Sequence, residues 1–185
     1  PATKANKGAK TKDKHWDDYV EGDGPAFFSA FIRAALDEAL TENPVIYQWH
    51  ASRCQALVEQ AWKANGLLWH QSIVWVKARS VLTRSHFMWK SEPCAYGWVE
   101  GKTIDQRPPA NESNVWEINQ QGEQDGIHPT QKPVELFSRP MRWHIPAGWL
   151  AYEPFSGSGT ALVAAEQEGR RCYAIEIAPA FVAVA

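Results

Sequence analysis

Apolar positions recur at helical spacing in two segments of the first half of the chain. Between residues 26 and 40 they return every three or four positions, which predicts an amphipathic helix that begins near Asp23 and Pro25. A second helix follows Ser52, and Asn65-Gly66 ends it. Its apolar face comprises Leu57, Val58, Ala61 and Trp62.

Short apolar runs predict the strands, namely Val45–Trp49, Ile73–Val76, Phe87–Trp98, Trp149–Tyr152 and Cys172–Ile175. A third helix is entered through Pro133, and an alanine-rich fourth helix ends at Gly169. Alternating strands and helices predict an α/β sheet with helices on both faces. Residues 99–127 are rich in Gly, Asn, Gln, Asp and Pro, so we expect a long surface loop with one apolar patch at Val115-Trp116.

The stretch Leu150–Thr160 contains the clearest chemical pattern in the sequence, a strand followed by a tight glycine turn and a helix. Glycine is typical where a ligand must approach the backbone, and Glu176, at the end of the next strand, suits two ribose hydroxyls. A plain loop between a strand and a helix is the competing interpretation. The dinucleotide pattern lacks its third glycine, and no Gly-Lys-Ser/Thr follows to form a phosphate loop. The unit is typical of half a nucleoside-binding fold.

Composition limits the remaining classes. The 185 residues fit one domain, and a net charge of -2 with 44% hydrophobic residues is typical of a globular protein. We expect no membrane span, and the three scattered cysteines favour a reducing compartment. The six histidines show no ligand spacing, so we expect no metal. The lysines of the first fourteen residues predict a solvated loop or, as the alternative, a loop that meets phosphates.

Two motifs together resemble the amino-group DNA methyltransferases, which methylate N6 of adenine or N4 of cytosine. They are His128-Pro129-Thr130-Gln131-Lys132-Pro133 and Glu153-Pro154-Phe155-Ser156-Gly157-Ser158-Gly159-Thr160. Their order is similar to that of the beta class, in which the catalytic half precedes the cofactor half. Further matches in the order of that class are Trp49-His50-Ala51, Val74-Trp75-Val76-Lys77 and Glu92-Pro93-Cys94-Ala95-Tyr96-Gly97-Trp98.

The resemblance implies an α/β, Rossmann-like, S-adenosylmethionine-dependent methyltransferase fold with a mixed, mostly parallel sheet and a permuted motif order. Residues 1–185 would form a single methyltransferase domain. Within it, residues 1–98 would be the catalytic half, residues 99–127 the target-recognition loop and residues 128–185 the cofactor-binding half.

The resemblance also implies a set of cofactor-binding residues. The glycine turn would hold the methionine part of S-adenosylmethionine, Glu176 the ribose hydroxyls and Ile177 the adenine ring. Thr130 and Lys132 would meet the cofactor carboxylate from the other side, whereas outside this motif Lys132 would be an ordinary surface lysine. The implied set is Thr130, Lys132, Glu153, Phe155, Ser156, Gly157, Ser158, Gly159, Thr160, Glu176 and Ile177.

The sequence departs from this family at its catalytic signature, Asp/Asn/Ser-Pro-Pro-Tyr/Phe/Trp. Pro108-Pro109 follows Arg107 and does not match it, so the catalytic residues are unknown. We expect the signature to precede residue 1 and the chain to be truncated at both ends. Glu153 stands where aspartate is usual in the family, and Ser91 where histidine often precedes the glutamate.

The function implied is transfer of a methyl group from S-adenosylmethionine to an extruded base in double-stranded DNA, with N6 of adenine favoured. N4 of cytosine is the first alternative, and a cofactor- or DNA-binding module without chemistry is the second. Lys77, Arg79 and Arg84 are candidates for phosphate contacts, or form an ordinary basic loop. The expected setting is the cytoplasm of a prokaryotic or phage-infected cell, without a membrane or metal partner. The oligomeric state stays open.

Overall fold

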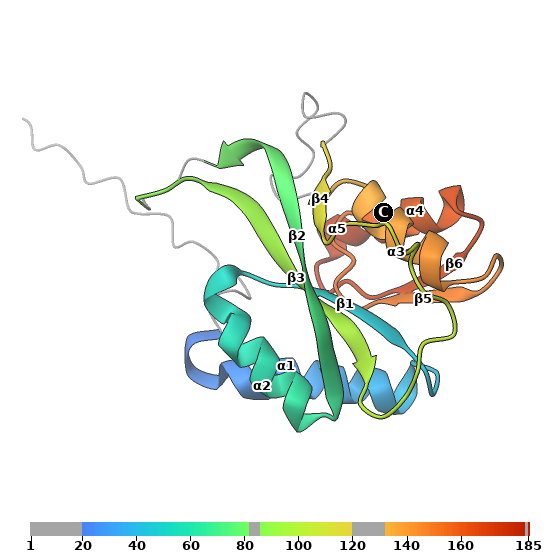
Figure 1. The fold of residues 1–185 in the computed structure, drawn as a ribbon, viewed down its shortest axis with the longest axis horizontal. Helices are drawn as coiled ribbons and strands as arrows, with labels where there is room; N and C mark the ends of the chain where they lie inside the picture. The colour runs from blue at the N-terminus through green and yellow to red at the C-terminus, as the bar shows by residue number, and fades with distance from the viewer. Residues whose placement is uncertain (1–19, 82–85, 120–131, 184) are drawn as a thin grey trace, which may run out of the picture.

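The computed structural model describes residues 20–81, 86–119, 132–183 and 185. Figure 1 shows the arrangement of the helices and strands. In chain order they are α1 (Val20–Glu38), β1 (Val45–Trp49), the short 3-10 helix η2 (Ser52–Cys54), α2 (Gln55–Ala64), β2 (Leu67–Val81), β3 (Trp89–Val99), β4 (Val115–Glu117), α3 (Glu135–His144), β5 (Leu150–Glu153), α4 (Thr160–Gln167), β6 (Arg171–Ala174) and α5 (Pro179–Val182).

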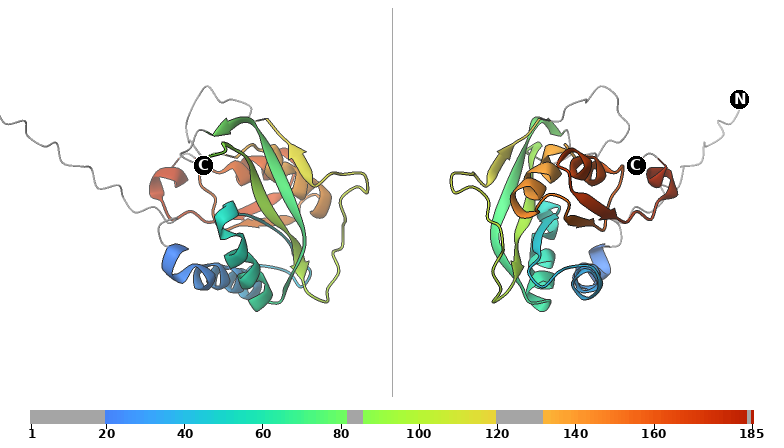
Figure 2. Two further views of the ribbon diagram at one scale, coloured as in Figure 1. Left: turned by 60° about the vertical axis from the view of Figure 1, so that its left-hand side comes forward. Right: turned by 90° about the vertical axis from the view of Figure 1, so that its right-hand side faces the viewer.

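The strands form two sheets. One has four strands in the order β1-β3-β2-β4, and the other is the parallel pair β5-β6. In the right-hand view of Figure 2 the long β2–β3 hairpin lies on one side of the molecule and the β5–α4–β6 unit on the other. Among the described residues, no backbone ladder joins the two sheets.

The central strand β3 is buried on both faces because helices cover the four-stranded sheet from both sides. Ala95 faces a core built mainly from α1 and α2, which includes Trp62. Its neighbour Cys94 faces the opposite core, which includes Leu136 of α3. Cys94 and Ala95 both have 0% exposed surface, as expected where successive residues of a strand point to opposite faces. The expected helices on both faces are confirmed.

A third core lies under the second sheet. Met141 of α3 packs there with Ala161, Ala164 and Ala165 of α4, and partly buried Cys172 of β6 joins them. Small alanine side chains allow α4 to lie close to α3 and to the strands. Helix α3 therefore contributes to two cores.

Gly97 marks the closest approach inside the large sheet. A Cβ atom at this position would lie 1.8 Å from the carbonyl oxygen of Leu68 and 2.9 Å from the Trp62 ring. The register of β2 shifts between Trp69 and Gln71, opposite this part of β3. Glycine is required here because the irregular β2 backbone occupies the space of a side chain.

Several expected boundaries were wrong. Helix α1 begins at Val20, and Pro25 lies inside it, since a proline removes only one hydrogen bond and the turns on either side continue. Strand β2 is much longer than Ile73–Val76, and the apolar patch of the expected loop is strand β4, parallel to β2.

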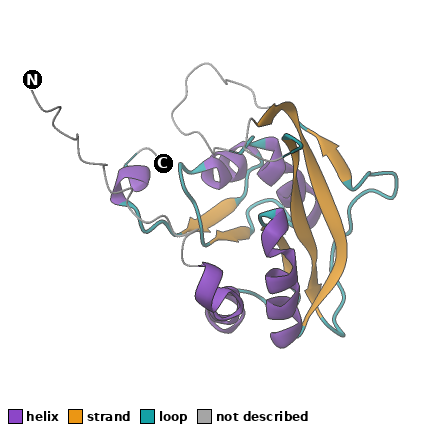
Figure 3. Cartoon of the chain, turned by 90° about the vertical axis from the view of Figure 1, so that its left-hand side faces the viewer, coloured by secondary structure: helices purple, strands orange, loops and turns teal. Residues whose placement is uncertain are grey.

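The sheets are less parallel than expected because consecutive β2 and β3 pair as an antiparallel hairpin, and β1 also pairs antiparallel with β3. Figure 3 shows the strong twist of this hairpin. No described helix is long and apolar enough to cross a membrane.

Buried His50 and half-buried His144 predict how stability depends on pH. Burial lowers the pKa of His50 and of His144 below the ordinary value. Nδ1 of His144 donates to the Gln106 carbonyl at 2.8 Å, so in the neutral ring Nε2 accepts a hydrogen bond from the Tyr47 hydroxyl, also at 2.8 Å. The unfolded chain takes up protons near pH 6.5 and the folded chain only at lower pH. We therefore expect the free energy of unfolding in urea to fall between about pH 7.5 and about pH 5.5.

The variant His144→Gln keeps an acceptor for Tyr47 and removes one titrating group. We expect a shallower pH dependence in this variant and a still shallower one in His50→Gln/His144→Gln. An unchanged slope in the double variant would show that other groups cause the dependence.

Candidate functional site

The glycine turn between β5 and α4 has the backbone that the sequence predicts for it. Gly157 and Gly159 have φ values of +54° and +81°, in the region that favours glycine. The amide of Ser156 donates to the Ile175 carbonyl at 2.9 Å, which fixes the turn to the residue after β6. A Cβ at Gly159 would lie 2.7 Å from that of Ala185, so this position has no room for a side chain.

Two carboxylates stabilise the backbone of this turn by accepting hydrogen bonds from its amides and from a neighbouring one. The Glu176 carboxylate accepts hydrogen bonds from the amides of Gly157 and Ala178, each at 2.8 Å. The Glu153 carboxylate accepts one from the Phe155 amide, also at 2.8 Å. Burial raises the pKa of Glu153, against the opposing effects of that hydrogen bond and of the Lys132 charge. The turn is thus held by side chains as well as by its own backbone.

The turn also offers a polar group and space to a ligand. The Ser156 hydroxyl is buried and has no hydrogen-bond partner among the described residues. A Cβ at Gly157 would meet no atom of the described residues within 4 Å, so they leave the space beside it open. A buried hydroxyl without a partner is unfavourable, and a ligand with a polar group would satisfy it.

Helix α1 supplies an aromatic wall to the site. The ring of Phe155, which is 53% exposed, packs edge-to-face on Phe31 at 5.0 Å between ring centroids and lies 6.3 Å from Phe27. These phenylalanines belong to the apolar face expected for the first helix, but helical spacing does not indicate that they meet the glycine turn. The exposed part of the Phe155 ring offers a flat apolar surface to a ligand.

A lysine–glutamate–lysine cluster joins the two halves of the chain. The Glu92 carboxylate on β3 lies 2.6 Å from the ammonium of Lys77 on β2 and 2.9 Å from that of Lys132, which precedes α3. Burial tends to raise the pKa of Glu92, but the charges and hydrogen bonds of Lys132 and Lys77 lower it below its ordinary value. The charge of Lys132 also tends to lower the pKa of Glu153, so this ammonium acts on the start of the glycine turn as well as on β3. The motif match included Glu92, but no local signal identified its two lysine partners.

The remaining predicted residues are placed differently. Ile177 is 87% exposed beyond β6. Lys77 faces Glu92 rather than open solvent, and Arg79 lies further along β2. Ser158 and Thr160 belong to the turn and the start of α4, and the Thr160 side chain is buried. Thr130 and Arg84 lie outside the described residues.

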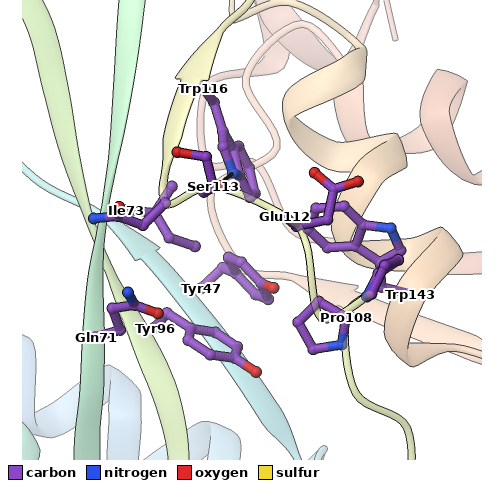
Figure 4. Close-up of a pocket in the computed structure, with 11 residues that line it drawn as sticks. Tyr47, Gln71, Ile73, Tyr96, Pro108, Glu112, Ser113, Trp116 and Trp143 are labelled. Atoms are coloured by element: carbon purple, nitrogen blue, oxygen red, sulfur yellow. Dashed lines mark hydrogen bonds between the residues drawn. The ribbon is translucent and has the colours of Figure 1, made fainter.

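A separate cavity of about 60 Å³ lies on the face of the four-stranded sheet (Figure 4). Tyr47, Tyr96, Pro108 and Trp143 are among its lining residues, and none of the glycine-turn residues contributes to it. It is far smaller than typical ligand pockets of about 300–1,000 Å³, so the glycine turn is the better candidate site. Within the described ranges, no group of three or more His, Cys, Asp or Glu side chains is placed to hold a metal ion.

Comparisons with known proteins agree on one family. A family model described as DNA methylase matches residues 48–185. The type II methyltransferase M.Cfr9I of Citrobacter freundii is 29% identical over an alignment of 196 positions, covering 99% of this chain and 60% of that protein. The YubD protein of Escherichia coli strain K12 is 27% identical over 117 residues, covering 63% of this chain and 49% of that protein. The chain thus spans about half to three fifths of these relatives.

Solved structures share the fold. The complex of M1.HpyAVI with SAM superposes with a TM-score of 0.72 at 19% identity, covering 86% of this chain and 78% of that one. The cytosine-N4-specific PvuII DNA methyltransferase superposes with a TM-score of 0.68 at 16% identity, covering 96% of this chain and 74% of that one. The α/β fold expected from the sequence is confirmed.

The Glu92 cluster predicts a measurable coupling energy. We expect Glu92→Gln and Lys132→Gln together to destabilise the fold by less than the sum of the single changes, because either change alone breaks the pair. A double-mutant cycle in urea unfolding should give a coupling on the order of 1 kcal/mol, reduced at high salt. The matched cycle of Glu92→Gln with Lys102→Gln should show none. A zero coupling for Lys132 would contradict the pairing.

Proposed function

The chain belongs to the DNA methylase family, and on this premise we propose that it binds S-adenosylmethionine at the glycine turn and methylates an exocyclic amino group in duplex DNA. The observation that carries the proposal is the convergence of three features on one turn. They are the open space beside Gly157, the unpartnered buried hydroxyl of Ser156 and the nearby ammonium of Lys132. Together they offer a backbone cradle, a polar partner and a positive charge.

The residues around the turn fit the chemistry of this cofactor. Lys132 would hold the cofactor carboxylate. Its ammonium has three N–H donors, and the ion pair with Glu92 leaves donors for a ligand. The proposal places the methionine part along residues 155–160. The Phe155 ring and Ile177 would contact apolar parts of the cofactor, and Ile177 is exposed enough to pack on an adenine ring. When bound, S-adenosylmethionine supplies a methyl group to a nucleophilic nitrogen.

The Glu176 carboxylate already accepts two backbone hydrogen bonds, one on each oxygen. Each carboxylate oxygen has a second lone pair, so both ribose hydroxyls can donate to it without breaking those bonds. We propose that Glu176 shapes the Gly157 backbone and binds the ribose at once. Glu153 would support the turn by accepting the hydrogen bond from the Phe155 amide.

The proposed partner is double-stranded DNA. Arg79 is an exposed cation of β2 and the best-placed described residue for a phosphate. Lys77 is partly neutralised by Glu92, so we assign it to holding the cluster rather than to DNA. Thr130 and Arg84 keep the roles implied by the motifs, as cofactor and phosphate contacts.

The target base is the finer part of the proposal. We favour N6 of adenine, which rests on the family resemblance alone, and the likeness to the cytosine-N4-specific PvuII enzyme supports N4 of cytosine as the alternative. The residue that distinguishes these targets belongs to the catalytic tetrapeptide, which does not occur in residues 1–185. A module that binds cofactor or DNA without chemistry is the remaining alternative.

Nucleoside mass spectrometry tests the reaction. Unmethylated DNA is incubated with S-adenosylmethionine and with the protein extended to include the residues encoded upstream of Pro1. We expect N6-methyladenine in the digested DNA, whereas N4-methylcytosine would establish the alternative target. Cofactor binding without any modified base, together with an upstream sequence that lacks the tetrapeptide, would establish the non-catalytic module.

The variant Gly157→Asp tests the cofactor site itself. An aspartate would put a side chain and a negative charge into the space that the proposal gives to the cofactor carboxylate, so calorimetry should detect no binding of S-adenosylmethionine. The control is Gly148→Asp, since Gly148 also has a positive φ, +78°, and no atom of the described residues within 4 Å of an added Cβ, but lies before β5. It should bind the cofactor normally. Equal affinity of both variants would contradict the placement of the site.

A further inference from the structure

The β2–β3 hairpin extends beyond the rest of its sheet. Trp49, the last residue of β1, pairs with Cys94, which in turn pairs with Ile73, so β2 continues past the end of β1 up to Val81. On its other edge, β4 pairs with β2 only as far as Val76. Figure 1 shows the far end of the hairpin, drawn in green, projecting from the molecule. At about 3.3 Å per residue, the part of β2 after Val76 adds roughly 15 Å to its reach.

Three consecutive large apolar residues stand exposed at the described end of this hairpin. Phe87 is 87% exposed, Met88 58% and Trp89 47%. Single exposed apolar residues are common on protein surfaces, but a contiguous group at the end of a projecting element marks an interaction site. We call Phe87, Met88 and Trp89 the hairpin tip.

The charge around the hairpin tip is positive. The described residues on its two strands, 77–81 and 86–91, include Lys77, Arg79 and Lys90 and no Asp or Glu. Lys90, beside the tip, is exposed, whereas Lys77 at the base is paired with Glu92. Apolar side chains flanked by cations complement a polyanion with an apolar interior, and duplex DNA, with phosphates outside and stacked bases inside, is such a partner.

The hairpin is anchored next to the glycine turn. Its base carries Glu92, which pairs with Lys132, and Lys132 lies near Glu153 at the start of that turn. Lys132 therefore connects the base of the hairpin to the start of the proposed cofactor site. A base that reacts there must leave the duplex stack, which requires unstacking of a base step.

From this geometry we infer that the hairpin tip is an apolar wedge that enters a groove of duplex DNA and unstacks the base step beside the target. The inference rests on the proposed function, because it takes duplex DNA as the substrate. Phe87 and Met88 supply the inserted surface, and Trp89 extends it toward the sheet. Lys90 and Arg79 contact the adjoining phosphates.

Binding of the full chain to a fluorescent duplex tests the wedge. The variant Phe87→Ser/Met88→Ser removes apolar surface without changing the charge, so duplex affinity should fall at least about 10-fold with an unchanged salt dependence. In a duplex that carries 2-aminopurine, the rise in fluorescence that reports unstacking should be lost. Lys90→Gln should instead reduce the slope of log K against log salt by about 0.9.

Two controls separate the wedge from general effects. Trp149→Ser removes a side chain that is 60% exposed just before β5, and it should leave duplex affinity unchanged. Calorimetric binding of S-adenosylmethionine should be unchanged in Phe87→Ser/Met88→Ser, which shows that the fold is intact.

The outcomes distinguish the wedge from the proposed function. Wild-type affinity and wild-type 2-aminopurine fluorescence in Phe87→Ser/Met88→Ser would overturn the wedge and leave the proposed function standing. A wild-type chain that binds S-adenosylmethionine but no duplex would overturn both. Self-association of the wild type that the variant abolishes, with no change in duplex binding, would identify the tip as an interface between copies and overturn the wedge.

Discussion

The position of the glycine turn relative to the large sheet depends on the packing of α3. Leu136 of this helix is 1% exposed in the core of the four-stranded sheet, while Met141 belongs to the core under β5 and β6. Phe137 packs against both cores. Because no described backbone ladder joins the sheets, side-chain packing rather than hydrogen-bonded pairing sets their distance.

Polar contacts at both ends of α3 give this packing a direction. Lys132 pairs with Glu92 just before the helix, and His144, its last residue, accepts a hydrogen bond from Tyr47 of β1. On the other side, Arg142 lies 2.6 Å from Glu168 after α4. Apolar cores alone tolerate rotation of a helix, whereas directional contacts at its two ends select one orientation. The site is therefore assembled by long-range polar pairs around a locally encoded turn.

The sequence predicted features that depend on neighbouring residues, and it missed contacts between residues far apart in the chain. Gly157 and Gly159 have the positive φ values expected of a tight turn, because that conformation follows from glycine itself. The partners of Glu92 lie on other elements, and spacing along the chain contains no information about them. The length of β2 was missed for a related reason. Among the described residues its outer part, beyond Val76, pairs with β3 alone, and it lacks the continuous apolar run of a strand buried on both faces.

The two sheets also differ in the order in which their contacts can form. In the β5–α4–β6 unit, Leu150 pairs with Arg171 across one short helix, so little chain entropy is lost when this unit closes. In the large sheet Val45 must find Trp98, and Val74 must find Val115, after much longer loops have been closed. Contacts of low sequence separation form faster. The unit that contains the glycine turn can thus acquire its native backbone while the surface that will face it is still being assembled.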